Sequence, residues 1–127
     1  MDIREIASKN FVLWTEALQT KDPQKVAELY ASDNTFLPTM SAEFKRGRSG
    51  AEEYFGHFLK KNPEGEIKKE EIQPLGENTY LHSGMYDFEV DKNGGRDVVE
   101  ARFSFVWKKE DGKWKIIHHH SSVKPQA

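Results

Sequence analysis

The chain has 127 residues, a formal net charge of −2 and no cysteine, and 12% of its residues are aromatic. The balanced charge excludes the strongly basic footprint of most nucleic-acid-binding domains. The lack of cysteine excludes disulfides, thiolate zinc sites and cysteine nucleophiles. The length fits one domain over residues 1–127. Because the apolar runs are short, we expect no membrane span and no signal peptide, hence a cytoplasmic protein without a membrane partner.

Two helices are predicted at the start of the chain. Asp2 precedes Glu5 by three residues, which is the spacing of a capping box, and apolar residues then recur at helical intervals as far as Leu18. Asp22 and Pro23 predict the cap and first residue of a second, shorter helix, with an apolar side over residues 26–30.

A short strand and a third helix follow. Residues 35–37 read as a strand that stops at Pro38. Ser49 with Glu52 predicts the start of the third helix, and Asn62 with the following proline predicts its end.

The second half of the chain changes from a helical to an extended pattern. Four strands are predicted, at residues 67–73, 79–90, 98–109 and 113–123, and Gly84 inside the second suggests a bulge or bend. Short connections between them imply an antiparallel meander. Helices followed by strands give an α+β domain in which three helices pack on one face of a curved, mostly antiparallel sheet.

The last two strands allow a prediction of which side chains face the helices. A two-residue turn at Asp111-Gly112 would pair Trp107 with Ile116, Phe105 with His118 and Phe103 with His120 on the helix-covered face. The other face would carry Arg102, Ser104, Val106, Lys115, Ile117, His119 and Ser121. A bulge or a one-residue slip would exchange the two faces.

Three consecutive histidines are the unusual feature of the last strand. Buried imidazoles need hydrogen-bond partners, so His118 and His120 predict a polar pocket beneath the helices. Trp14 and Tyr54 could line it, and Arg102 and Arg48 are candidates for supplying positive charge to a small-molecule ligand, although Arg102 lies on the other face in this register.

Several chemistries remain open for this pocket. His118 and His120 could act as general acid or base, could be structural, or could share a metal ion if a third ligand exists. Asp33 is a candidate carboxylate base. No nucleophile-elbow sequence surrounds Ser121 or Ser122. We therefore assign no catalytic residue, no metal and no cofactor.

The chain also resembles a known family. The segments FVLWTEALQT (11–20), ARFSFVW (101–107) and GKWKIIHHHSS (112–122) are similar to the association domain of calcium/calmodulin-dependent protein kinase II, and more closely to its free-standing relatives outside animals. The resemblance covers almost the whole chain, and the order of the segments is more specific than any one of them.

The resemblance implies a nuclear transport factor 2-like (cystatin-like) cone. In the kinase this domain is a hub that assembles dimers into rings, so the implied function is homodimerisation or larger self-assembly, without catalysis, around a pocket open to a small molecule. The residues expected at the subunit interface are Tyr86, Phe88, Val106, Ile117 and His119. The alternative, from the same superfamily, is an enzyme of the ketosteroid isomerase or SnoaL-like polyketide cyclase type.

Overall fold

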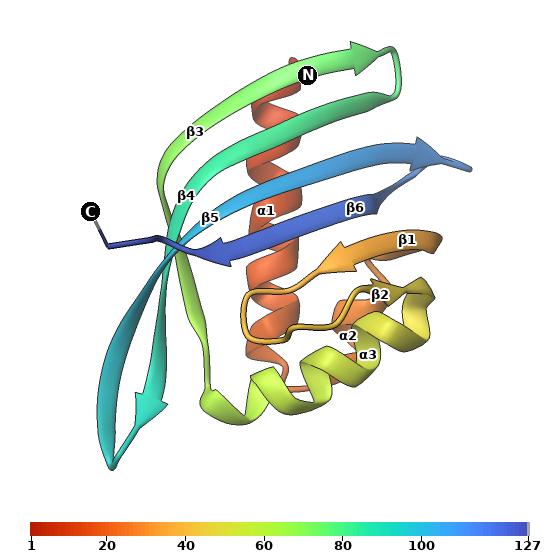
Figure 1. Ribbon diagram of the computed structural model, residues 1–127. Coiled ribbons are helices and arrows are strands. Elements are labelled where there is room, and N and C mark those ends of the chain that lie inside the picture. Colours follow the sequence, from red (N-terminus) through yellow and green to blue (C-terminus); the bar gives the residue numbers. More distant parts are fainter. Residues whose placement is uncertain (127) are drawn as a thin grey trace.

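The computed structural model describes residues 1–126, and it has the predicted α+β organisation (Figure 1). A curved sheet wraps around the long helix α1, which runs across the strands on one face. The elements, in chain order, are α1 (Ile3–Gln19), α2 (Pro23–Ala27), β1 (Tyr30–Leu37), β2 (Lys45–Arg46), α3 (Gly47–Phe58), the single 3₁₀ turn η1 (Leu59–Lys61), β3 (Glu64–Gly76), β4 (Thr79–Lys92), β5 (Gly95–Glu110) and β6 (Lys113–Val123).

The six strands form one sheet in the order β2-β1-β6-β5-β4-β3. Strands β3 to β6 pair consecutively and antiparallel, which confirms the predicted meander. Strand β1 adds to this meander in parallel with β6 and carries the two-residue β2 on its outer edge. The sheet is therefore mostly antiparallel, and β6 lies near its middle.

The first two helices begin where the capping residues predict. The Asp2 carboxylate accepts a hydrogen bond from the Glu5 backbone N–H at 2.9 Å, and Asp22 accepts one from the Gln24 N–H at 2.9 Å. Because these oxygens satisfy amides that have no partner inside a helix, they fix the two starting points. The predicted start of the third helix at Ser49 was wrong. Helix α3 begins at Gly47, and no side-chain cap is formed there.

The second helix is shorter than its apolar pattern suggests, and β1 is longer. Helix α2 ends at Ala27, and Tyr30 already pairs with Ile116 of β6. The Leu29 carbonyl accepts a hydrogen bond from the Ile116 N–H at 2.8 Å. Pairing with a strand 86 positions later therefore overrides the local helical pattern, in a way that the segment 26–30 alone does not reveal.

The bend predicted at Gly84 is present. A Cβ at Gly84 would lie 1.9 Å from the Lys69 carbonyl oxygen, so only glycine allows the two strands to approach this closely. The register between β3 and β4 shifts beside this point, between Ile67 and Lys69. This bulge accompanies the bend with which the sheet wraps around α1 (Figure 1).

The core lies between α1, α3 and one face of the sheet, which we call the inner face. It is built mainly from aromatic rings. The inner-face residues of β4, β5 and β6 are Tyr80, His82, Tyr86, Phe88, Ala101, Phe103, Phe105, Trp107, Ile116, His119 and Ser121.

Candidate functional site

A single extra residue in β6 decides which histidines face the core. Trp107 lies opposite Ile116, as predicted, but Val106 then lies opposite His118, so Ile117 is the additional residue of a bulge. Beyond the bulge every side chain exchanges faces. The prediction that His118 and His120 point beneath the helices was therefore wrong, and His119 takes the inner position.

His119 is stacked between two aromatic rings. Its ring centroid lies 4.1 Å from that of Phe105 and 4.8 Å from that of Phe36, with interplanar angles of 23° and 13°. The Trp14 ring meets it edge-on at 5.7 Å and 88°. Since only 2% of His119 is exposed, its two ring nitrogens must find partners inside the protein.

Both nitrogens find a tyrosine hydroxyl. The Tyr30 hydroxyl lies 2.9 Å from His119 Nδ1, and the Tyr86 hydroxyl lies 3.2 Å from Nε2. The Trp14 indole N–H, which can only donate, donates to the Tyr30 oxygen at 3.2 Å. The Tyr30 hydroxyl proton is therefore free to point at Nδ1, which places the imidazole proton on Nε2.

The chain of hydrogen bonds continues in one direction. His119 Nε2–H donates to the Tyr86 oxygen, and the Tyr86 hydroxyl donates to Ser121 Oγ at 2.7 Å. Ser121 Oγ is in turn hydrogen-bonded to Thr39 Oγ1. One neutral tautomer of His119 thus satisfies this buried network, which we call the inner network: Trp14, Tyr30, Thr39, Tyr86, His119 and Ser121.

Burial favours the neutral form of each of these groups. It lowers the pKa of His119 well below its usual value, and the adjacent His118 and His120 act in the same direction. Burial also raises the pKa of the Tyr30 and Tyr86 hydroxyls. The inner network is therefore an arrangement of neutral hydrogen-bonding groups and has no charge to offer a ligand.

The inner network borders a very small cavity. The cavity measures about 10 Å³, which is room for about one water molecule. Trp14 and Tyr54, both predicted to bind a ligand, line it together with His119 and Ser121. A cavity of this size does not amount to the predicted polar pocket, and a different histidine faces it.

A larger pocket opens outside it, between α3 and the loop after β1. It measures about 460 Å³, and Tyr54 and Phe58 border both this pocket and the inner cavity. Its wall contains Lys45, which forms ion pairs with Glu53 and, at 3.6 Å, with Glu43. The lysine is thereby neutralised by residues of the pocket itself.

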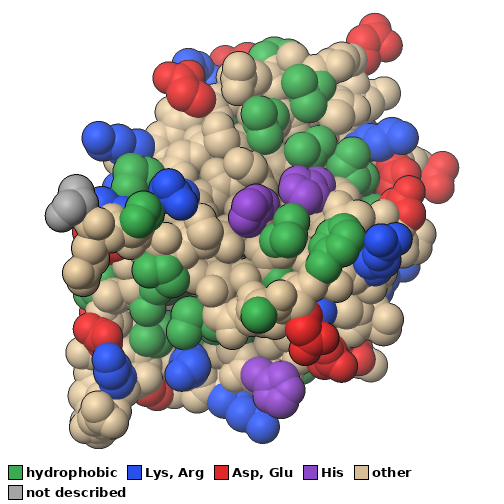
Figure 2. Space-filling model, in the orientation of Figure 1, with side chains coloured by type: hydrophobic (Ala, Val, Ile, Leu, Met, Phe, Trp, Pro, Cys, Tyr) green, Lys and Arg blue, Asp and Glu red, His purple; other side chains and the backbone are tan. Residues whose placement is uncertain are grey.

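The opposite face of the sheet, here called the open face, carries no helix in residues 1–126 and is the face seen in Figure 2. Its side chains line up in three rows across the strands. The first row is Leu81, Val106, His118 and Thr35, the second is Ser83, Ser104, His120 and Leu37, and the third is Met85, Arg102 and Ser122. Apolar, small polar and imidazole side chains therefore dominate its middle.

His118 and His120 stand in the first two rows, on the same strand. His118 is half-buried, and its Nδ1 lies 2.7 Å from the Thr35 hydroxyl oxygen. Burial lowers the pKa of His118, and the neighbouring His120 adds to the effect. His120 is exposed beside it.

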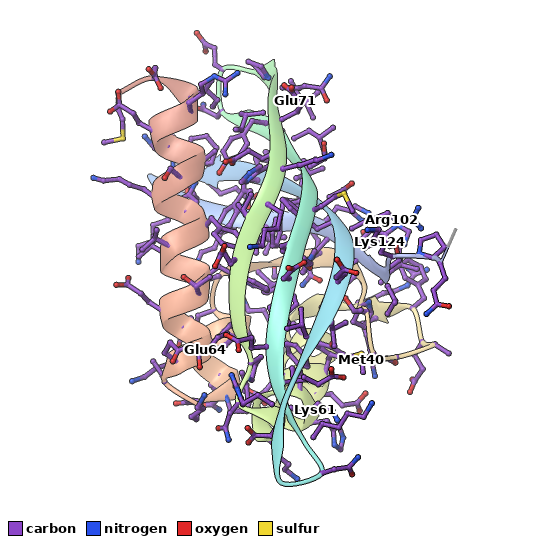
Figure 3. All side chains as sticks on the ribbon, turned by 90° about the vertical axis from the view of Figure 1, so that its left-hand side faces the viewer. Met40, Lys61, Glu64, Glu71, Arg102 and Lys124 are labelled. Atoms are coloured by element: carbon purple, nitrogen blue, oxygen red, sulfur yellow. The ribbon has the colours of Figure 1, made fainter. Side chains whose placement is uncertain are left out.

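The remaining predicted site residues divide between the two faces. Arg102 points away from α1 (Figure 3) and donates a hydrogen bond to Ser122 Oγ at 3.4 Å, so it lies far from the inner cavity. Tyr86, Phe88 and His119 were expected at a subunit interface, but all three are at most 3% exposed and belong to the core. For His119 the bulge in β6 is the reason, whereas Tyr86 and Phe88 lie on β4, whose faces the turn at Asp111-Gly112 does not determine. Val106 lies on the open face as expected, and Ile117 is half-buried at the bulge.

Three residues that complete the inner network were not predicted as site residues: Tyr30, Thr39 and Ser121. Tyr30 was placed on a helix and Ser121 on the outer face. The available signal was the run of three histidines, because a buried imidazole requires hydrogen-bond partners and nearby hydroxyl side chains can provide them.

Residues 1–126 contain no helix long and apolar enough to cross a membrane. Among the same residues, no group of three or more His, Asp or Glu side chains is placed to hold a metal ion.

Comparison with known families settles the relationship suggested by the sequence. The family model of the calcium/calmodulin dependent protein kinase II association domain matches residues 3–125. The chain belongs to this family. A solved structure from Xanthomonas campestris, described as an association domain of the same kind, is 44% identical and superimposes with a TM-score of 0.94 over 100% of this chain and 91% of that chain.

More distant structures share the fold. The hub homology domain of Chlamydamonas reinhardtii has 18% identity and a TM-score of 0.81, covering 98% of this chain and 100% of that chain. A nuclear transport factor 2-like protein from Salmonella enterica has 21% identity and a TM-score of 0.81, covering 97% and 92%. This association-domain chain therefore has the nuclear transport factor 2-like fold, as the resemblance implies. No functionally curated protein matches it significantly.

Proposed function

We propose that this association-domain protein assembles with copies of itself through the open face of its sheet, and that it has no catalytic role. The observation that carries the proposal is the composition of that face. Leu37, Leu81, Met85 and Val106 are half-buried there and lie around the paired histidines. Interface centres are depleted in charged residues and enriched in apolar ones, and this face has the same character.

Charged side chains lie toward the edge of the same face. The open-face rows continue onto β3 through Lys69 and Glu71, opposite Met85 and Ser83. An apolar patch with a polar rim is typical of a protein interaction site. A free sheet face of this kind is best covered by a second sheet, because two sheets can pack closely face to face.

A second copy of the chain is the partner that fits the family. The family is named for association, and its Chlamydamonas relative is described as a hub homology domain. Most soluble homo-oligomers are symmetric, and in a two-fold dimer the same patch is buried on both subunits. The open face can serve as such a patch because the side chains of its first two rows are apolar, small and polar, or imidazole, while the charged Arg102 stands in the third row.

The alternative of an enzyme in the cone receives less support. The two histidines proposed as acid and base lie on the open face, outside the inner cavity. The histidine that does border the cavity is held by two tyrosines on both ring nitrogens. The cavity has room for about one water molecule, so we propose no reaction there.

Sedimentation velocity on the wild type and two variants tests the proposal. Val106→Glu places a carboxylate in the middle of the open face, whereas Val12→Glu places one on the exposed side of α1, where the valine is 48% exposed. We expect a dimer or larger assembly for the wild type at micromolar concentration. Val106→Glu should weaken it by roughly tenfold or more, because burying an unpaired charge is costly.

The control Val12→Glu should assemble like the wild type. A wild type that stays monomeric throughout the micromolar range would overturn the proposal. Equal assembly of Val106→Glu and wild type would assign the interface to another surface.

A further inference from the structure

Two imidazoles stand together in the middle of the open face. His118 and His120 occupy alternate positions of β6, so their side chains project from the same side of the strand. Histidine side chains lie side by side near the centre of this face, among hydrophobic ones (Figure 2). Strand β6 has two strands on one side of it and three on the other, which places the pair well away from either edge of the sheet.

One of the two imidazoles is already oriented. The Nδ1 of His118 is 2.7 Å from Thr35 Oγ1 on the neighbouring strand β1. When Nδ1–H donates to this hydroxyl, Nε2 carries a lone pair, and it has no hydrogen-bond partner among residues 1–126. Histidines that bind metals commonly have their second nitrogen held in this way, because the hydrogen bond fixes both the tautomer and the ring orientation.

Two imidazole nitrogens make up half of a tetrahedral ligand set. Zinc bound in proteins is usually tetrahedral, with nitrogen ligands at about 2.0–2.1 Å, so two histidines fill half of its positions. Within residues 1–126 no third His, Asp or Glu side chain is placed to join them. A further pair of imidazoles must therefore come from outside the chain.

A second copy of the chain would supply that pair. In a two-fold interface, residues near the axis meet their own counterparts. The histidines lie near the middle of the open face, so face-to-face packing would bring two His118–His120 pairs together. We infer that His118 and His120 form a binding site for a divalent transition metal of the zinc, nickel or copper type, completed by the same two residues of a second copy. This inference rests on the proposed self-association.

The ligand set favours these metals over alkaline-earth ions. Imidazole suits zinc, nickel and copper, whereas magnesium and calcium take oxygen ligands. The site is thus expected to bind zinc in the presence of excess magnesium, and the bound ion would link two subunits.

Zinc titration of untagged, EDTA-treated protein tests the inference, with isothermal calorimetry for stoichiometry and native mass spectrometry for assembly. We expect one zinc ion per two chains, and a dimer that dissociates less readily when zinc is bound. His118→Ala and His120→Ala should each remove this binding. His57→Ala, which changes an exposed histidine of α3, should leave it intact.

Thr35→Val distinguishes a metal site with an oriented His118 from adventitious binding by two surface histidines. The variant keeps both imidazoles and removes the hydroxyl that orients His118. Zinc affinity should fall by roughly tenfold, as is typical when the hydrogen-bond partner of a metal-bound histidine is lost. Circular dichroism confirms that each variant is folded.

The outcomes distinguish this inference from the proposed function. A dimer of unchanged strength with no zinc bound would overturn the metal site and leave self-association standing. Zinc bound one per chain, without any change in assembly, would overturn the shared site. A protein that is monomeric with and without zinc would overturn the proposed function as well.

Discussion

Neighbouring histidines of β6 have opposite environments on the two faces of the sheet. On the inner face, His119 is stacked between Phe36 and Phe105, and two tyrosine hydroxyls satisfy its nitrogens. On the open face, His118 has one partner, Thr35, and His120 is exposed. The same side chain is thus a saturated part of the core at one position and an available ligand at the next. The inner face accounts for stability, and the open face is where function is proposed.

The largest effect is expected for Trp14→Ala, in the helix α1 that packs against the inner face. The Trp14 ring is 1% exposed and packs against the rings of Phe105, Tyr86 and His119. Removing it should cost about 3–5 kcal/mol in the free energy of unfolding, the usual range for a buried large aromatic. Urea denaturation followed by circular dichroism measures the loss. A loss below about 1 kcal/mol would contradict the assignment of Trp14 to a close-packed core.

His119→Ala should be the next most damaging change. It leaves a cavity between two rings and deprives the Tyr30 and Tyr86 hydroxyls of a partner, which together should cost roughly 2–4 kcal/mol. His119→Gln, which keeps donor and acceptor atoms, should lose less. Equal losses for the two variants in the same urea assay would show that the inner network contributes nothing beyond the volume of the ring.

The pH dependence of stability should contain a contribution from His82 on the inner face. Burial lowers its pKa, although Glu70 of β3, 2.8 Å from Nε2, acts in the opposite direction. The rings of Phe11 and Phe103, which pack against it from α1 and β5, carry no charge.

Because the pKa is lower in the folded state, the unfolded chain binds the proton more readily below a pH of about 6.5. The stability contribution is therefore complete above that pH and is lost as the pH falls toward the folded-state pKa. Urea unfolding at neutral and at mildly acidic pH should show a smaller loss for His82→Gln than for the wild type. An equal loss of stability in His82→Gln and the wild type would show that His82 does not contribute to the pH dependence.

The smallest effect on stability is expected for His118→Ala on the open face. The side chain is half-buried and loses a single hydrogen bond, so the free energy of unfolding of the subunit should change by about 0.5 kcal/mol or less. His119→Ala is a well-matched variant for comparison, because the two positions are adjacent in one strand. A loss as large as that of His119→Ala would show that the open face contributes to folding as strongly as the core.

Much of the fold could be predicted from local signals. Asp2 and Asp22 mark two helix starts, and the strands of the meander follow from their alternation and from turns such as Asp111-Gly112. Strand β1 could not be delimited in this way, because Tyr30 is fixed by pairing with Ile116, far along the chain.

The prediction of the candidate site depended on one bulge residue, Ile117, which no local sequence signal reveals. The bulge at Ile117 reverses the faces of all positions after it, and the sequence HHH reads equally well in either register. Its physical basis is visible only in the structure, where Tyr30 and Tyr86 offer partners to a single inward imidazole. The alternative register would place two imidazoles in the core, each requiring partners of its own.

Chemical footprinting of the histidines tests most directly whether the open face is covered in the assembled protein. Diethyl pyrocarbonate modifies accessible imidazoles, and mass spectrometry gives the rate at each position. In the assembled wild type, His120 should react much more slowly than the exposed His57 of α3, and in Val106→Glu the two should react at similar rates. Equal rates for His120 and His57 in the wild type would show that the open face remains in solvent, and would contradict self-association through it.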